Sequence, residues 1–565
     1  MNLLDQAISA LSPQAGVKRM AARAALNVGT ALSASAPTEP GGRIAGPGGY
    51  NGGQSDRRAT RGWRARVRSA NADGAQRKTL VARSRDAVMN LPLATALIDR
   101  RVTFVVGTGM MAIPQLDAER LGISPEDAAQ LTAQIMRDYD RYMASKDPDA
   151  ERVATGYEQQ EVVLRGKLES GDVLAIRVMP ENQPGRRARM AWKLIEGDRV
   201  VSPFGHVEGM PLGTDGPVVV HGVELDGYGA ATAYHVLKRA PAPFGARQSN
   251  DTVRIPAWGD RTGLPTALLV MQKKRPEQAR GIPVLGPVLE TLKQISDLTE
   301  AELFAAVMTA MLAIVYKSPG AGALPEADYG TGDLVQSDGV PETVSATRSD
   351  YRLESGTVLE IDSEDEVEVK SPGRPNPAFD PFFMALARQL GAATETPASV
   401  LMMEFNASYT ASKAEIETYY MTTRRDQGAL ASQWCDPHYE AWLFEAVARG
   451  RYPLITGFFT DPLRRELWCD VRHRGDGKIS LNPLQEAKAL EIFEAHGWRT
   501  GADISAELAG ADYDTNVKTR IGEHERWIAG GLPIPNAPGG GVDTLSGGAA
   551  APSGDQTNGD TTNGA

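Results

Sequence analysis

Hydrophobic residues recur at helical spacing, about every three to four positions, along several stretches of the chain. The pattern predicts helices over 79–102 with an interruption near Pro92, over about 120–145 after a Ser-Pro-Glu-Asp start, over about 284–317, over 376–396 with an end near Gly391, over 412–450 as one or two helices, and over 482–498. A short amphipathic helix is also expected at the N-terminus, where Leu3, Leu4, Ile8 and Leu11 are spaced in the same way.

The middle of the chain has a different pattern. Between 161 and 270 the apolar runs are short, rich in β-branched residues and separated by Gly, Pro and Asp, as in DVLAIRVM, RMAWKLI, PVVVHGVEL, ATAYHVLK and TALLVMQ. The stretch 351–370 is also expected to form two strands, around an acidic turn. Helices and strands are thus segregated along the chain, which is typical of an α+β fold.

Changes in composition divide the chain into parts. The expected parts are an N-terminal helix (1–28), a flexible linker rich in Gly, Ala, Pro and Ser (29–56), a basic segment with a helical part (57–160), a β-rich region (161–283), a long helix with a loop (284–352), strands and C-terminal helices (353–538), and a low-complexity tail expected to be disordered (539–565).

Charge and cysteine content limit the possible functions. The chain of 565 residues carries a formal net charge of −11, so it is not expected to wrap nucleic acid over its whole surface. Residues 57–85 are the exception, with ten basic side chains against Asp73; six of the ten are candidate partner-binding residues, Arg57, Arg58, Arg61, Arg64, Arg66 and Arg68. Two cysteines are too few for a disulfide framework or a Cys-rich zinc site. The longest apolar run, 303–316, is shorter than the roughly 20 residues that span a membrane.

The stretch TFVVGTGMMAIP, residues 103–114, resembles a nucleotide-binding motif. A β-branched run taken as a strand precedes Gly107-Thr108-Gly109-Met110-Met111-Ala112, which matches G-x-G-x-x-A. The match would make the chain a dinucleotide-dependent oxidoreductase. Pro114, however, would break the helix that must follow the glycines, and the pattern before the strand is helical, so no βαβ unit is present. We therefore expect Gly107 and Gly109 to form a structural turn between a helix and a strand, where glycine permits positive φ.

No other motif predicts an active site. RGDGKIS, residues 474–480, lacks the full phosphate-loop pattern and is typical of a β-turn. The seven histidines show no metal-binding spacing, and His438 near Cys435 and Asp436 has no companion motif that would make it part of a nucleophile pair. We expect no enzymatic activity, cofactor or metal. A run of acidic residues is a candidate channel wall or, equally, an exposed loop: Asp362, Glu364, Asp365, Glu366 and Glu368.

Several motifs together resemble those of one family. The basic stretch SDRRATRGWRARVRSANAD precedes LVARSRDAVMNLPLATALIDRRVTFVVGTGM, where the family has a helix followed by a strand ending in V-V-G-T-G. Further matches are LESGDVLAIRV (168–178), LIEGDRVVSPFG (194–205), GVELDGYGAATAYHV (222–236), RIPAWGDRTGLPTALLVMQKKRPEQARGIPVLGPVL (254–289), LESGTVLEI (353–361), FNASYTASKAEIE (405–417) and ISLNPLQEAKA (479–489). In this order they resemble the portal proteins of lambda-type tailed bacteriophages. The chain departs from the family pattern in three places: ALLVMQ replaces a usual His, Lys413 (followed by Ala414) stands where Arg is usual, and Asn482 stands where Asp is usual.

The resemblance implies a structural protein with a wing, a helical stem, a clip and a C-terminal helical crown. Such subunits form a ring, usually of twelve, at one vertex of the capsid. The ring is the conduit for double-stranded DNA during packaging by terminase and during ejection. Implied partners are the terminase large subunit, the major capsid protein and scaffold, and the head-completion or connector proteins. The implied location is the virion, with assembly in the host cytoplasm.

The resemblance also gives roles to the expected parts. Residues 57–160 would include a helical part of the wing, 161–283 would belong to wing or clip, 284–352 to a stem or wing helix with a channel-side loop, and 353–538 to wing strands and the helices of the crown. A channel that passes DNA without holding it favours an acidic wall, since like charges repel phosphate. A nucleic-acid-binding protein with a basic arm at 57–85 is a further alternative.

Overall fold

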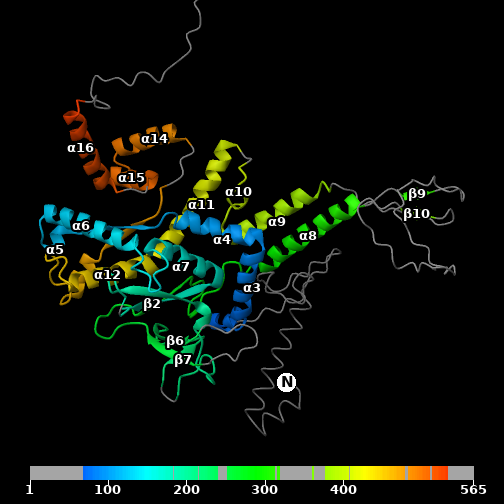
Figure 1. The fold of residues 1–565 in the computed structure, drawn as a ribbon, viewed down its shortest axis with the longest axis horizontal. Helices are drawn as coiled ribbons and strands as arrows, with labels where there is room; N and C mark the ends of the chain where they lie inside the picture. Colours follow the sequence, from blue (N-terminus) through cyan, green and yellow to red (C-terminus); the bar gives the residue numbers. More distant parts are fainter. Residues whose placement is uncertain are drawn as a thin grey trace, which may run out of the picture. The chain divides into compact units, whose positions relative to one another are not determined.

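The computed structural model describes residues 68–181, 183–213, 216–239, 251–311, 315–317, 359–361, 376–405, 408–477, 482–509 and 512–531 (Figure 1). By its internal contacts the chain divides into two units, Met1–Arg68 and Ser69–Ala565. All the elements below belong to the second unit. The expected N-terminal helix, the linker and the C-terminal tail lie outside the described residues.

Two helices begin the second unit after a 3-10 turn, η2 (Ala70–Gln76): α3 (Arg77–Asn90) and α4 (Pro92–Val105). The expected interruption near Pro92 is confirmed: Leu91 is extended and Pro92 occupies the first turn of α4, where its missing N–H costs nothing. The expected strand at 103–106 is wrong, because residues 103–105 form the last turn of α4. Burial of Val102 and Val105 outweighs the β-preference of that run. The strand begins later, as β1 (Met111–Pro114).

Three helices with polar caps follow: α5 (Ala118–Leu121), α6 (Pro125–Met143) and α7 (Gly156–Ser170). Ser124 caps α6 as its sequence predicts, accepting a hydrogen bond from the Asp127 N–H. Helix α7 was not expected: it begins with a capping box of Thr155 and Glu158 and runs across residue 161, where the β-rich region was placed. Its buried face includes Gln159, Gln160 and Lys167, so hydrophobic spacing does not reveal it.

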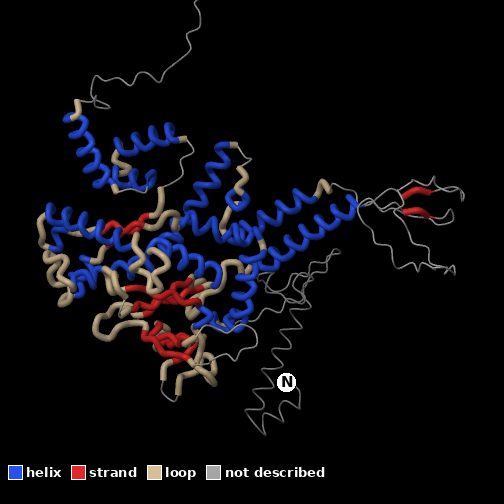
Figure 2. Tube along the Cα trace, viewed as in Figure 1, coloured by secondary structure: helices blue, strands red, loops and turns tan. Residues whose placement is uncertain are grey.

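Two antiparallel sheets occupy the middle of the chain (Figure 2). The first has the order β3-β2-β8, formed by β2 (Asp172–Val178), β3 (Ala191–Glu196) and β8 (Ala267–Met271). The second has the order β4-β5-β6-β7, formed by β4 (Val218–Val220), β5 (Val223–Leu225), β6 (Ala231–Leu237) and β7 (Thr252–Pro256). Ala175 of β2 packs in the main core and Leu174 in a second core with Tyr234 and Val236, because alternate side chains of a strand face opposite ways.

The expected long helix is α8 (Leu289–Met311), which packs against α9 (Phe379–Thr394). The expected helix over 284–317 is therefore too long at both ends: Val315–Lys317 is a strand, β9, paired in parallel with β10 (Leu359–Ile361). In Figure 1 the segment that joins the two helices carries β9 and β10.

The remaining described elements are mainly helical: α10 (Ala398–Met402), α11 (Tyr409–Leu430), a π-helical turn η4 (Ala431–Cys435), α12 (Asp436–Ala448), α13 (Pro462–Trp468), α14 (Pro483–Ala495), α15 (Gly501–Ala509) and α16 (Tyr513–Ala529). The one strand among them, β11 (Val471–Arg474), pairs with β1 antiparallel. The turn η4 ends where Pro437, which has no N–H to donate, enters the first turn of α12.

The main hydrophobic core lies among α4, α6, α7, η4, α12 and the β2 sheet. At its centre aromatic rings meet edge to face: Tyr139 lies 5.1 Å from Tyr439 and 5.0 Å from Trp442, and Trp192 lies 5.4 Å from Trp434. Because these rings come from α6, β3, η4 and α12, the core joins an early helix, the first sheet and the helical segment η4–α12 into one body.

Candidate functional site

The turn Gly107-Thr108-Gly109 connects α4 to β1, and both glycines adopt positive φ, +56° and +120°. The Thr108 N–H donates to Asp476 Oδ2 at 2.8 Å, and the Thr108 hydroxyl donates to Asp476 Oδ1. The motif that resembled a nucleotide-binding loop therefore directs its central N–H at a carboxylate of this chain. A strand rather than a helix follows it, so the oxidoreductase interpretation has no support in this geometry.

Both glycines of the turn are also required because a side chain at either position would clash with a neighbouring residue. A Cβ at Gly107 would lie 2.0 Å from Asp476 Oδ2, and one at Gly109 would lie 2.3 Å from Tyr157 Cδ1. Asp476 belongs to RGDGKIS, the other sequence that resembled a phosphate loop. Pairing of β1 with β11 brings the two motifs together.

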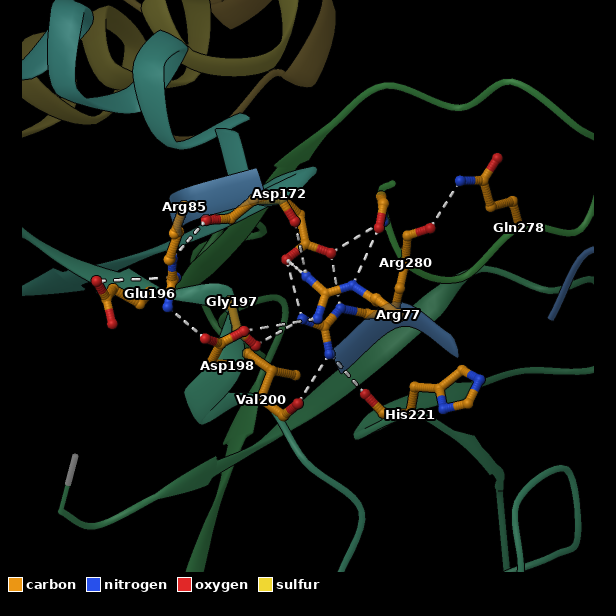
Figure 3. A network of polar contacts seen from close by, with 12 residues as sticks. Arg77, Arg85, Asp172, Glu196, Gly197, Asp198, Val200, His221, Gln278 and Arg280 are labelled. Atoms are coloured by element: carbon orange, nitrogen blue, oxygen red, sulfur yellow. Dashed lines mark hydrogen bonds and ion pairs between the residues drawn. The ribbon is translucent and has the colours of Figure 1, made fainter. Parts of the chain in front are cut away.

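A second polar cluster joins α3, β2 and the segment before α8 (Figure 3). Asp172 is fully buried at the start of β2 and accepts hydrogen bonds from two arginines. Arg77 Nη2 donates to Asp172 Oδ1 at 2.6 Å, and Arg280 donates through Nε to Oδ2 at 2.8 Å and through Nη2 to Oδ1 at 2.9 Å. The Gly281 N–H donates to Oδ2 at 2.9 Å. We call Arg77, Asp172 and Arg280 the arginine–aspartate junction.

The two arginines of this junction also bind backbone carbonyls of four segments. Arg280 donates to the carbonyls of Gly197, Val200 and His221 at 2.6–2.8 Å. Arg77 donates through Nε to the Gly281 carbonyl at 3.0 Å and through Nη2 to the carbonyl of Ser170, at the end of α7, at 3.2 Å. The junction therefore fixes the first turn of α3, the 3-10 turn η3 (Gly197–Arg199), the β4–β5 turn and the segment before α8 against one another.

The electrostatics of the junction follow from burial and charge pairing. Burial alone would raise the pKa of Asp172, but the adjacent charges of Arg280 and Arg77 outweigh it and hold that pKa below its ordinary value. For Arg77, burial and then the neighbouring charge of Arg280 lower the pKa to about 10. The group is thus an ion triad, and loss of the carboxylate would leave two buried guanidiniums without their partner.

Two glycines allow the backbones to meet beneath this junction. Gly171, at φ +90°, ends α7, and a Cβ at Gly281 would lie 1.8 Å from the Gly171 carbonyl oxygen. The motif LESGD therefore contains Asp172 and Gly171, and RPEQARG contains Arg280 and Gly281. Each motif supplies one charged partner of the junction and one glycine that lets the two backbones approach each other. Our sequence interpretation used these motifs only for the family resemblance and did not identify their residues as one cluster.

A cavity of about 590 Å³ lies beside the junction, between α3 and the loops of the second sheet. Its charged lining includes Arg77, Lys78, Arg85, Asp198 and Arg280. Arg85 and Asp198 form an ion pair at 2.5 Å across it. Its lining also contains Ser202 and His221, but both are engaged by the backbone. The Ser202 hydroxyl accepts from the Gly222 N–H at 2.9 Å, and His221 Nε2 lies 3.0 Å from the Asn71 carbonyl oxygen.

The Cys435–Asp436–His438 group is not a nucleophile site. Cys435 is buried, and burial raises the pKa of its thiol, which leaves it protonated. His438 is also buried, which together with the nearby His473 lowers its pKa to about 3. Its Nδ1 lies 2.9 Å from the Tyr139 hydroxyl in the aromatic core.

Most of the expected charged candidates lie outside the described residues. This holds for Asp362, Glu364, Asp365, Glu366 and Glu368, and for Arg57, Arg58, Arg61, Arg64 and Arg66. Arg68 is described and is exposed. In the described part of the chain no cluster of three or more His, Cys, Asp or Glu side chains is arranged to hold a metal ion. None of the described helices is both long and apolar enough to cross a membrane.

Comparison with known proteins identifies the family. The model of the lambda family of phage portal proteins matches residues 56–427, and the chain belongs to this family. It is similar to the portal protein of Escherichia phage N15, with 22% identity over 472 residues that cover 80% of this chain and 85% of the relative. The protein is thus a structural component of a phage capsid, not an enzyme.

Two solved structures are also similar to this chain. The neck of a native GTA particle computed with C12 symmetry has a TM-score of 0.38 and 13% identity, covering 76% of this chain and 92% of the other. The neck of an empty GTA particle computed with C6 symmetry has a TM-score of 0.39 and 14% identity, covering 80% and 94%.

Proposed function

We propose that copies of this chain, twelve in the ring that the family usually forms, close into a ring at one capsid vertex. Double-stranded DNA would pass through the ring during packaging and ejection. The match of residues 56–427 to the portal family carries this proposal. The ring would bind the terminase large subunit during packaging, head-completion proteins afterwards, and the major capsid protein and scaffold during assembly in the host cytoplasm.

The distribution of apolar side chains supports assembly with further copies. Helices α14 and α16 have no buried residue within the described chain. Their apolar side chains Leu484, Ile521 and Ile528 are each more than half exposed. On α8, Leu303 and Phe304 are about two-thirds exposed. Apolar surface of this extent is typical of protein–protein contact sites, and in a ring each such face meets a different face of the next subunit.

The arrangement of α8 and α9 supports a more specific assignment. We infer that this helix pair is the stem and that the segment between them, residues 312–378, is the clip that meets terminase. The acidic run 362–368 would then belong to the clip. The β-rich region 161–283 would belong to the wing, because both of its sheets are tied to α3 and α7 by the arginine–aspartate junction.

Co-expression with the major capsid protein, scaffold and terminase tests this function. Wild-type protein should give procapsids that package linear DNA into a nuclease-resistant form. A variant with residues 318–357 replaced by a short Gly-Ser linker should still form rings but should lose packaging and terminase capture. Normal packaging without this chain would contradict the portal function. Normal terminase capture by the linker variant would contradict the clip assignment alone.

A further inference from the structure

Two arginine-rich turns that are far apart in the sequence lie side by side in the structure. One is the β2–β3 connection, with Arg186, Arg187 and Arg189, and the other is the end of α12, with Arg449 and Arg451. Arg449 Nη1 donates to the Arg187 carbonyl at 2.8 Å. The Glu445 carboxylate of α12 accepts from the Arg189 N–H at 2.8 Å and from the Met190 N–H at 2.7 Å.

Two buried acidic residues hold the β2–β3 connection from the inside of the protein. The Arg187 N–H donates to Asp147 Oδ2 at 3.0 Å, and Arg186 donates to the carbonyls of Asp147 and Asp149 at 2.6 Å each. Asp147 and Asp149 are only 5% and 7% exposed. Their carboxylates are therefore directed at backbone groups inside the protein, and they leave the outer surface of the turn to the arginines.

The outward side chains form a concentrated basic surface on an acidic chain. Arg187, Arg189 and Arg451 are exposed. The Arg449 side chain is 36% exposed and forms an ion pair with Glu445 at 2.5 Å, so it contributes less free charge than the others. Among the described residues, neither the Arg187 nor the Arg189 guanidinium has a hydrogen-bond or ion-pair partner. We call Arg187, Arg189, Arg449 and Arg451 the arginine surface. Its unpaired guanidiniums are available to an external anion.

We propose that the arginine surface binds the phosphate backbone of double-stranded DNA on the outside of the assembled protein. The planar guanidinium fork matches phosphate oxygens, and contacts of this kind need no base readout. Between the arginines of each turn stand only the buried Ala188 and the exposed Gly450. Apolar side chains near the first turn, Met179, Pro180 and Pro184, line a pocket on the side of Arg186 and Arg189. Because the Arg187 and Arg189 guanidiniums have no partner among the described residues, the surface offers several unneutralised positive charges, which favours a polymer of closely spaced phosphates.

Relaxed, covalently closed DNA minicircles test this proposal on the full-length assembled protein. A closed circle cannot enter the channel of a closed ring, so only binding outside the channel is measured. The double variant Arg187→Ala/Arg189→Ala removes the two unpaired guanidiniums without removing a contact that holds the turns. Arg239→Ala/Arg261→Ala, at two exposed arginines elsewhere, has the same change in net charge and serves as the control.

The proposal predicts that the first variant binds minicircles about tenfold more weakly near 100 mM salt. The slope of log affinity against log salt should fall in magnitude by about two, because two phosphate contacts are lost. The control should bind like wild type. Equal affinities for all three proteins would overturn the proposal, as would a polyglutamate peptide that competes as effectively as duplex DNA at equal charge. Because ring formation is measured separately by electron microscopy, failure here leaves the proposed channel function intact.

Discussion

The body around the arginine–aspartate junction and the C-terminal helices α14–α16 differ in how their side chains are covered. In the body, Asp172 is fully buried and the rings of Trp192, Trp434 and Tyr439 are less than 2% exposed. Helices α14 and α16 bury no residue, although both carry large apolar side chains. The body is therefore stabilised from within a single chain, whereas large apolar side chains of α14 and α16 stay exposed in the described chain and would face other copies in the proposed ring. Substitutions in the body should change the stability of the subunit, and those on the helices should change assembly.

The largest expected effect is at the centre of the body. Asp172→Ala should lower the free energy of unfolding by about 3–5 kcal/mol, because Arg77 and Arg280 would remain buried without their carboxylate. Chemical denaturation measures this change. Glu523→Gln, which removes an exposed partner of Arg520 on α16, is the matched control and should leave the midpoint unchanged. An Asp172→Ala midpoint equal to that of wild type would show that the triad does not stabilise the body.

The next effect concerns the turn between α4 and β1. Gly107→Ala/Gly109→Ala should cost at least about 2 kcal/mol, since each alanine adopts an unfavourable positive φ and each Cβ meets Asp476 or Tyr157. Thermal unfolding measures the loss, and ring yield should fall with it. Gly122→Ala is the control, because its φ is +70° but no atom lies within 4 Å of a new Cβ. It isolates the backbone cost of about 1 kcal/mol. A loss in the double variant no greater than twice that of Gly122→Ala would show that the contacts with Asp476 and Tyr157 are unimportant.

A smaller effect depends on pH and involves His438. Its pKa is lowered to about 3 in the folded protein, from about 6.5 in an unfolded chain, so the unfolded state binds the additional proton as pH falls. Its contribution to stability is complete above about pH 6.5 and is lost as the pH falls toward 3. Over that window the unfolding free energy should decline by at most about 1.4 kcal/mol per pH unit.

Denaturation midpoints at pH 7, 6 and 5 measure this slope. His438→Gln keeps a polar group near Tyr139 but cannot titrate, so its midpoint should vary less with pH than that of wild type. Identical pH profiles for the two proteins would contradict neutral burial of His438.

The sequence predicts the local part of this architecture better than its long-range contacts. The cap at Ser124 and the helix start at Pro92 are predicted from neighbouring residues. The turn at Gly107 and Gly109 is predicted from the change in pattern around it. By contrast, nothing local indicates that Thr108 meets Asp476, because the two residues are 368 positions apart. Helix α7 was missed for a related reason: Gln159, Gln160 and Lys167 share its buried face with Val163, Leu164 and Leu168, so polar residues interrupt the hydrophobic spacing.

The same limit applies to the polar cluster. Asp172, Arg280 and Gly281 stand in motifs that are visible in the sequence, but periodicity describes single elements and cannot pair a strand residue with one 108 positions later. The charges at 57–66 and 362–368 were found from composition alone, and their roles in binding partners or lining a channel stay predictions.

The smallest effect on subunit stability is expected on the C-terminal helices. Ile521→Asp/Ile528→Asp should leave the unfolding midpoint unchanged, since both side chains are more than half exposed, but it should reduce ring formation. Sedimentation velocity measures the assembly state. Removal of residues 540–565, which lack the apolar content for packing, is the control and should leave assembly intact. Rings of normal yield from the aspartate variant would show that this face of α16 is not an interface.

Imaging of the purified full-length protein by negative-stain electron microscopy, with particle mass measured in parallel, tests the central claim most directly. A portal ring predicts closed particles of about a dozen subunits with an opening along the symmetry axis. Monomers at all concentrations, or closed particles without an axial opening, would contradict the account.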